Sequence, residues 1–168
     1  MLVRWAVLAL LLVISLVLET TLFHWLSVWG VQPDLVLVLV VFFALFSGSS
    51  GGAFFGFLGG LAQDALSGQY LGLNAFSKMI TGYIVAQLER KIYKDYPLIP
   101  VLVVFVVSLA SHTLIFLLLL PITTQPTFTE LYIREILPAA AYNCLIAGLT
   151  YSKFRQSITR GWLKLSEY

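Results

Sequence analysis

Few side chains in this chain could do chemistry, and the most conspicuous of them is Asp64. It lies within the glycine-rich, apolar segment GGAFFGFLGGLAQDALSGQYLG (51–72). A carboxylate left unpaired in lipid is costly, so Asp64 should find a partner. Lys78 lies as far after Leu71 as Asp64 lies before it, and a hairpin turning at 68–71 would bring both to a similar depth. We therefore expect Asp64 to be buried, ionised and hydrogen-bonded, with Lys78 as its leading partner. Such a pair could pin the hairpin or line a polar cavity.

Other polar residues gather around the same place and could form a small polar pocket at the outer end of the helices. The group comprises Gln63, Asp64, Gln69, Asn74, Ser77 and Lys78. Two further acids, Glu19 and Asp34, fall near the outer ends of the first two expected helices, where we expect them to cap helices at the membrane interface.

Catalytic, cofactor and metal chemistry has no support in the sequence. There is no phosphate-binding loop, no HExxH, no pair of carboxylates at ligand spacing and no serine nucleophile motif. The single cysteine, Cys144, excludes an internal disulfide and a cysteine zinc site, and the isolated His24 and His112 lack metal-ligand spacing. The sequence predicts a protein that is not an enzyme and binds neither a cofactor nor a metal ion.

The composition indicates an integral membrane protein of one domain. Of the 168 residues, 60% are hydrophobic and 11% are charged, whereas soluble domains are about a quarter charged. Long apolar runs such as 5–18, 35–46 and 98–120 indicate membrane helices. The alternating pattern of an outer-membrane barrel is absent.

Six helices are expected in an all-α fold. The first retains the apolar N-terminal run, for which a cleaved signal peptide is the alternative. The second and third are short for a span of about 20 residues, and the turn SGSSGG joins them, so a hairpin that does not fully cross remains an alternative. We place the helices at about 3–22, 33–47, 51–67, 71–90, 97–120 and 131–151.

The distribution of positive charge predicts that both termini are cytoplasmic. With six spans in that orientation, the outer connections at about 23–32, 68–70 and 121–130 contain no lysine or arginine. The cytoplasmic segments then satisfy the positive-inside rule, because they carry eight of the ten basic residues: Arg4, Arg90, Lys91, Lys94, Lys153, Arg155, Arg160 and Lys164.

The expected organisation is a six-helix transmembrane domain over 1–152 and a basic amphipathic cytoplasmic tail over 153–168. In the tail, apolar residues interleave with Lys153, Arg155, Arg160 and Lys164. We expect these four basic side chains to rest on anionic lipid. The alternative is a docking motif for a cytoplasmic partner.

From Gly48 to Gly68, every fourth residue is a glycine except Asp64. This spacing forms a ridge along a helix that another backbone can approach closely, as in GxxxG crossings. Packing inside the chain is the first interpretation, and contact with a second protein is the alternative. The candidate helix-packing or partner-binding residues are Gly48, Gly52, Gly56, Gly60, Gly68 and Gly72.

Several of these motifs resemble the rod shape-determining MreD family of bacteria. The resemblance is strongest over about 33–87, in PDLVLVLVVFFAL (33–45), GFLGGLAQDALSG (56–68) and the LG at 71–72. The carrying residues are the Pro-Asp start of the second helix, the G-x-x-x-G-x-x-x-D spacing of Gly56, Gly60 and Asp64, and the SG-x-x-LG turn. Lys78 is not part of that pattern, so its pairing with Asp64 would be peculiar to this chain.

The resemblance implies a multi-pass protein of the bacterial inner membrane that acts as a non-enzymatic scaffold in cell-shape control. It implies MreC as a partner, together with MreB and with RodA and its transpeptidase partner, in lateral peptidoglycan synthesis by the elongasome. It also implies a fold similar to the six-helix substrate-binding subunits of energy-coupling-factor transporters. Membrane lipids and a second copy in a homodimer are further candidate partners, and nucleic acid is not expected. The alternative function is a small-molecule or lipid-binding or transport subunit with a polar pocket near Asp64.

Overall fold

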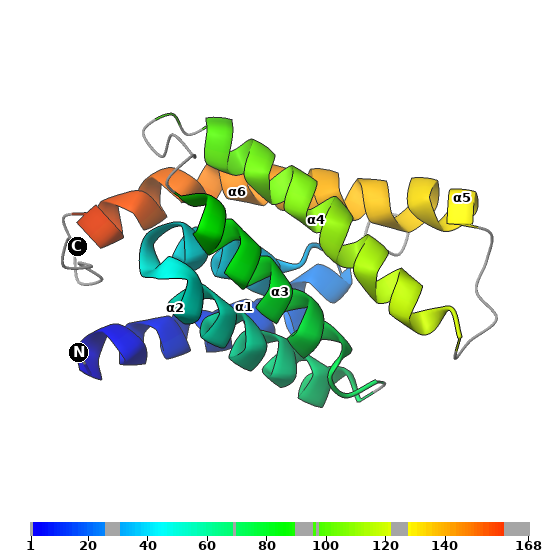
Figure 1. The fold of residues 1–168 in the computed structure, drawn as a ribbon, viewed down its shortest axis with the longest axis horizontal. Coiled ribbons are helices and arrows are strands. Elements are labelled where there is room, and N and C mark those ends of the chain that lie inside the picture. The colour runs from blue at the N-terminus through cyan, green and yellow to red at the C-terminus, as the bar shows by residue number, and fades with distance from the viewer. Residues whose placement is uncertain are drawn as a thin grey trace.

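The protein is described here by a computed structural model, in which residues 2–25, 31–68, 70–89, 96, 98–121 and 128–159 are placed. At 2–4, 22–25, 128 and 158–159 only the backbone is described. The described residues confirm the all-helical prediction and contain no strand. The helices are α1 (Leu2–Trp25), α2 (Leu35–Ser67), α3 (Leu73–Leu88), α4 (Leu98–Leu119), α5 (Phe128–Leu131) and, after a π-helical turn at Tyr132–Ile136, α6 (Leu137–Thr159) (Figure 1).

Helix α2 is two helical segments folded back on each other at Gly48. The backbone of Gly48 has φ 71° and ψ 166°, a conformation that glycine adopts without steric cost. A Cβ on Gly52 would lie 3.0 Å from Ala44 Cβ, and one on Gly59 would lie 2.9 Å from a methyl of Val36. These contacts make the two segments antiparallel, and Figure 1 shows the chain reversing in the cyan part of the ribbon. The expected second and third helices and their tight turn are therefore present.

Among the described residues, two helices are long and apolar enough to cross a membrane by length and composition, Leu35–Ser67 and Leu98–Leu119, and Trp5–Thr21 is a shorter apolar stretch. Because α2 is folded at Gly48, its two segments must be considered separately as spans. The first segment, 35–47, is shorter than the ~20 residues that a bilayer core needs. Six complete spans thus remain a prediction.

The first segment of α2 is the central element of the fold. Every residue from Val36 to Leu45 is buried, although this run is almost entirely apolar and would suit a lipid-facing helix equally well. On one side, Phe42 packs edge-on against Tyr151 of α6, with ring centroids 5.2 Å apart. On the other side, Phe43 packs against Phe55 of the second segment, with ring centroids 4.8 Å apart.

The glycine ridge packs against α3 with a constant register. A Cβ on Gly52 would lie 2.6 Å from the carbonyl oxygen of Gly82, and one on Gly56 or Gly60 would collide with the backbone of Lys78 or Asn74, respectively. Each step of four residues forward on α2 thus matches a step of four backward on α3. The space beside Gly52, Gly56 and Gly60 is filled by the chain's own helix.

The helical segments alternate in direction between two ends of the bundle. In Figure 1 the start of α1, the α2 turn, the end of α3, the start of α4 and the end of α6 lie toward the left. The end of α1, the α2–α3 connection and the end of α4 lie toward the right. Helix α6 continues through 153–159 without interruption, so the described part of the expected tail extends the last helix.

Candidate functional site: a buried polar network

Lys78 is the cation at the centre of a polar network that links the helices. Its side chain is fully buried, and its Nζ lies 2.7 Å from Oδ2 of Asp34, at the start of α2. The same Nζ donates a hydrogen bond to Oδ1 of Asn74, one turn earlier on α3, at 3.1 Å. The expected Asp64–Lys78 pair is therefore wrong: the partner of Lys78 is Asp34.

The physical reason is the register of the α2–α3 hairpin. The expected pair assumed a turn centred on Leu71, whereas the glycine contacts place Gly56 opposite Lys78 and Gly60 opposite Asn74. Asp64, one turn beyond Gly60, consequently lies at the beginning of α3. Close backbone approach along the ridge, which needs glycine on α2, sets this offset.

Asp64 is completely buried and holds the N-terminus of α3. Its Oδ2 accepts hydrogen bonds from the backbone N–H groups of Gly72 (2.9 Å) and Ala75 (3.1 Å). Its Oδ1 accepts from the backbone N–H (3.2 Å) and the side-chain amide (2.9 Å) of Asn74. The first N–H groups of a helix lack partners within it and carry partial positive charge. Gly72, at the N-cap position of α3, has no side chain that could cap the helix. The carboxylate of Asp64, on the preceding helix, supplies this cap instead.

Asp34 combines two roles, of which the sequence predicted one. Its Oδ1 accepts a hydrogen bond from Leu37 N at 2.8 Å and thereby caps α2, as expected of an acid at a helix start. The same Oδ1 accepts from Nε2 of Gln63 at 3.2 Å, and Oδ2 faces Lys78. Asp34 thus ties the start of α2 to the end of α2 and to α3.

Glu19 connects α1 to both segments of α2. It is only 9% exposed. One carboxylate oxygen accepts from Val36 N at 3.0 Å, and the other accepts from Nε2 of Gln63 at 2.9 Å. Glu19 was expected to cap a helix at the membrane interface. In the structure it also holds α1 against the first segment of α2.

The α4–α6 side of the network was not predicted. The backbone N–H of Asp34 donates to Oδ1 of Asn143 at 2.7 Å, and Nδ2 of Asn143 donates to Ser108 Oγ at 3.0 Å. Ser77 and Ser111 share a hydrogen bond between their hydroxyl oxygens at 2.7 Å. The available signal was the isolated amide Asn143 within an apolar helix, since such residues in membrane helices commonly hydrogen-bond across to a neighbour.

An open pocket adjoins the network beside Glu19. It has a volume of about 380 Å³ and lies among α1, the second segment of α2 and the start of α3. It does not include Asp64, whose oxygens are occupied by α3. The lining residues are Leu16, Glu19, Thr20, Gln32, Gln63, Leu66, Ser67 and Asn74.

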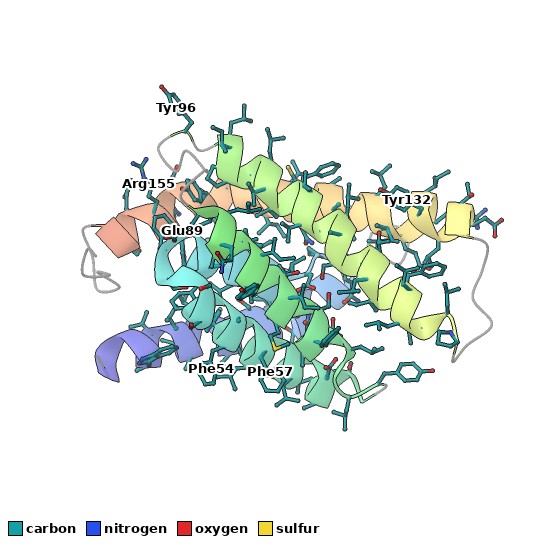
Figure 2. The ribbon with its side chains drawn as sticks, in the orientation of Figure 1. Phe54, Phe57, Glu89, Tyr96, Tyr132 and Arg155 are labelled. Atoms are coloured by element: carbon teal, nitrogen blue, oxygen red, sulfur yellow. The ribbon has the colours of Figure 1, made fainter. Side chains whose placement is uncertain are left out.

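The remaining predicted residues divide into three groups. Gly48, Gly68 and Gly72 have positive φ and serve turns and helix ends, with open space where a Cβ would stand. The side chain of Lys153 is exposed on α6, and Arg155, at the α6 end labelled in Figure 2, is partly buried. The third group, which includes Arg4, Gln69, Lys91, Arg160 and Lys164, has side chains outside the described residues.

Within the part of the chain that is described, no three acidic, histidine or cysteine side chains are grouped so as to hold a metal ion. The outer face of the second α2 segment is apolar: Phe54 and Phe57, labelled in Figure 2, are 54% and 40% exposed, and the ring of Phe54 also packs edge-on against Trp5 of α1. The described contacts of the site are ion pairs and hydrogen bonds between helices.

Comparison with known proteins identifies one family. The family described as rod shape-determining protein MreD matches residues 1–156 of the 168-residue chain. No curated protein and no solved structure matches, so the expected likeness to energy-coupling-factor subunits stays a prediction. The match covers α1 to α6 almost completely and includes every residue of the polar network. The chain belongs to the MreD family of rod shape-determining proteins, which are bacterial membrane proteins.

Proposed function

We propose that this protein is a multi-pass scaffold of the inner membrane that binds MreC and supports lateral peptidoglycan synthesis by the elongasome. Membership of the MreD family supports the role in rod-shape determination. The proposed assembly also includes MreB and RodA with its transpeptidase partner. In this assembly the protein positions other proteins and catalyses no reaction itself.

The observation that carries the scaffold proposal is that three buried polar side chains, Lys78, Asp64 and Asn143, hold helices together. Lys78 binds Asp34, Asp64 caps α3, and Asn143 bridges the start of α2 to Ser108 of α4. Polar groups removed from water are tolerated in an apolar bundle when they are paired. Paired contacts of this kind between helices rigidify a helix bundle, and a binding platform requires rigidity.

Six crossings with cytoplasmic termini are the proposed topology. The alternation of the helical segments between two ends of the bundle supports an even number of crossings, because α1 begins at the end where α6 finishes (Figure 1). The distribution of lysine and arginine supports the orientation. In this topology Glu19, Asp34 and Asp64 lie toward the outer side of the membrane.

The scaffold proposal is tested by recovery of partners from native membrane together with complementation. The tagged parent is expected to recover MreC and to restore rods in a strain that lacks the protein. Lys78→Met should weaken both, because the unpaired Asp34 loosens the bundle, and Leu58→Ala on the exposed face of α2 is the matched control. Failure of the parent to recover MreC, with rods retained in the deletion strain, would refute the proposal.

The alternative, a small-molecule or lipid-binding or transport subunit, is favoured by one observation, the open pocket beside Glu19. A tightly bound small molecule in the purified protein, detected by mass spectrometry, would support this alternative. Recovery of a single-span partner would support the scaffold. The same experiment reports the mass of the assembly and therefore tests whether a second copy of the chain, the other candidate partner, is bound.

A further inference from the structure

In the pocket beside Glu19, one acid has no ion-pair partner and one amide oxygen has no hydrogen-bond donor among the described residues. Glu19 receives hydrogen bonds from Val36 N and Gln63 Nε2, yet among the described residues no basic side chain forms an ion pair with it. Oε1 of Gln63 is buried and has no hydrogen-bond partner in the described part of the chain. Both residues line the same pocket, and they are bonded to each other.

The other residues that line the pocket indicate which chemical class of ligand it can bind. Four neutral polar residues, Thr20, Gln32, Ser67 and Asn74, and two leucines complete the wall. Among the described residues, no lysine or arginine lines the pocket, and the one buried cation of that part of the chain, Lys78, binds Asp34. When ionised, an acid that has no ion-pair partner attracts a cation and repels an anion, most strongly where water is scarce. The pocket therefore suits a cationic group with N–H donors.

The position of the pocket indicates that this cation is carried by a membrane amphiphile. Leu66 on the pocket wall is 60% exposed, and Val17, next to the lining residue Leu16 on α1, is 52% exposed. Such apolar side chains favour contact with hydrocarbon. A volume of about 380 Å³ lies at the lower end of the range for small-molecule sites. It suits a polar headgroup whose acyl chains remain outside.

We propose that this pocket binds the primary ammonium headgroup of an aminophospholipid such as phosphatidylethanolamine. A primary ammonium has three N–H donors, so it can donate to Glu19 and to other acceptors of the pocket wall. Choline carries the same charge but has no N–H donor, and phosphatidylglycerol is anionic. The proposal depends on the protein lying in a membrane and is independent of any contact with MreC.

The experiment measures lipid retention by the purified full-length chain in native mass spectrometry. Phosphatidylethanolamine, its N-methyl and N,N-dimethyl derivatives, phosphatidylcholine and phosphatidylglycerol are compared at equal concentration, with free ethanolamine as a separate arm. Retention should fall as N–H donors are replaced by methyl groups, with phosphatidylethanolamine held about tenfold more tightly than phosphatidylcholine, since a charge-assisted hydrogen bond contributes that order of affinity.

Two pairs of variants place the effect in the pocket. Glu19→Gln should abolish the preference for phosphatidylethanolamine, whereas Glu130→Gln, at an exposed acid of α5, should preserve it. Thr20→Val should weaken retention, whereas Thr21→Val should not. Thr21 is the matched control because its hydroxyl also bonds a carbonyl of its own helix but does not line the pocket. If Glu19→Gln does not fold, the threonine pair decides the location.

Each other outcome contradicts the proposal. Equal retention of all the phospholipids would show ordinary annular lipid. Binding of free ethanolamine as tight as that of the lipid would identify a soluble amine as the ligand. Undiminished retention of phosphatidylethanolamine by Thr20→Val would place the lipid elsewhere on the protein.

Discussion

The Nζ of Lys78 lies 2.7 Å from Oδ2 of Asp34, across the boundary between α3 and the start of α2, with the lysine side chain fully buried. This contact joins residues that are far apart in the sequence. Asp34 also caps α2 by accepting a hydrogen bond from Leu37 N. The same carboxylate therefore binds α3 through Lys78 and stabilises the N-terminus of α2.

A double-mutant cycle on this pair should show strong coupling. Lys78→Met leaves Asp34 as an uncompensated buried charge and should lower the free energy of unfolding by about 3 kcal/mol. Asp34→Asn should also destabilise the protein, and the double variant should recover part of the loss. The readout is thermal unfolding in detergent for all four proteins.

The control cycle pairs Lys78→Met with Asp64→Asn. Asp64 and Lys78 share Asn74 as a neighbour but form no ion pair, so their coupling should be weaker than that of Lys78 with Asp34. The reverse order of the two coupling energies would restore the pairing expected from the sequence and contradict the structure.

The glycine ridge predicts opposite effects for two glycine-to-alanine substitutions. A methyl group at Gly56 would collide with the carbonyl group of Lys78, which is backbone and cannot rotate away. Gly56→Ala should therefore cost about 2 kcal/mol of stability through overpacking. Gly148 lies in α6 with nothing within 4 Å of an added Cβ, so Gly148→Ala should be neutral or stabilise the helix by up to about 1 kcal/mol.

Thermal unfolding in detergent compares the two alanine variants with the parent. Equal midpoints for Gly56→Ala and the parent would show that α2 and α3 do not approach as closely as described. A loss in Gly148→Ala as large as that in Gly56→Ala would show that glycine is needed for a reason other than packing on α3.

Much of the fold could be predicted because helical membrane segments have strong local signals. Apolar runs indicated α1 and α4, and SGSSGG indicated the reversal at Gly48. The sequence predicted packing of the ridge inside the chain as the first interpretation, and the structure identifies α3 as the helix that faces it. What could not be predicted was the register of α2 on α3, because it depends on how closely two backbones approach at Gly52, Gly56 and Gly60.

The candidate site was predictable in its members but not in its pairings. Asp64, Lys78, Asp34, Glu19 and Asn74 were singled out because polar groups are rare in apolar helices, and the structure brings all five into one network. The observed register of α2 on α3 differs from the expected one, and Lys78 therefore pairs with Asp34 and not with Asp64. The contacts of Asn143 join α6 to the start of α2 over a long sequence separation, and no local pattern encodes such a contact.

The proposed topology predicts that the end of α6 is cytoplasmic. Ser157 is exposed there, so Ser157→Cys in a Cys144→Ser background should resist a membrane-impermeant thiol reagent in intact cells and react after lysis. Permeabilising an outer membrane, where there is one, should not change this. Labelling of intact cells would contradict the six-span topology with cytoplasmic termini.

The basic residues near the end of the chain should help to hold this orientation. Each lysine or arginine near an anionic membrane surface contributes about 1 kcal/mol. Replacing Lys153, Arg155, Arg160 and Lys164 together by glutamine should therefore weaken partner recovery or loosen the orientation of Ser157→Cys. Unchanged shape, partner recovery and labelling would show that these charges are dispensable.

Asp64 provides the most specific prediction, because its two oxygens serve different donors. Oδ2 receives the backbone N–H groups of Gly72 and Ala75, and Oδ1 receives both donors of Asn74. The amide of Asp64→Asn can satisfy only one of these sides, and its NH₂ group must face N–H donors on the other. We expect a loss of about 2 kcal/mol, with faster hydrogen exchange confined to the first turn of α3.

The control is Ser67→Ala, which removes a hydroxyl that donates to the carbonyl oxygen of Asp64 but leaves the carboxylate contacts intact. This variant should keep the slow exchange of the first turn of α3. If Asp64 also shapes the surface that MreC meets, Asp64→Asn should fail to restore rods even at a temperature where most of the protein is folded. Full complementation by Asp64→Asn, together with unchanged hydrogen exchange at Gly72 and Ala75, would contradict both the functional role and the capping role. A cap whose loss does not open the first turn of α3 does not stabilise that helix.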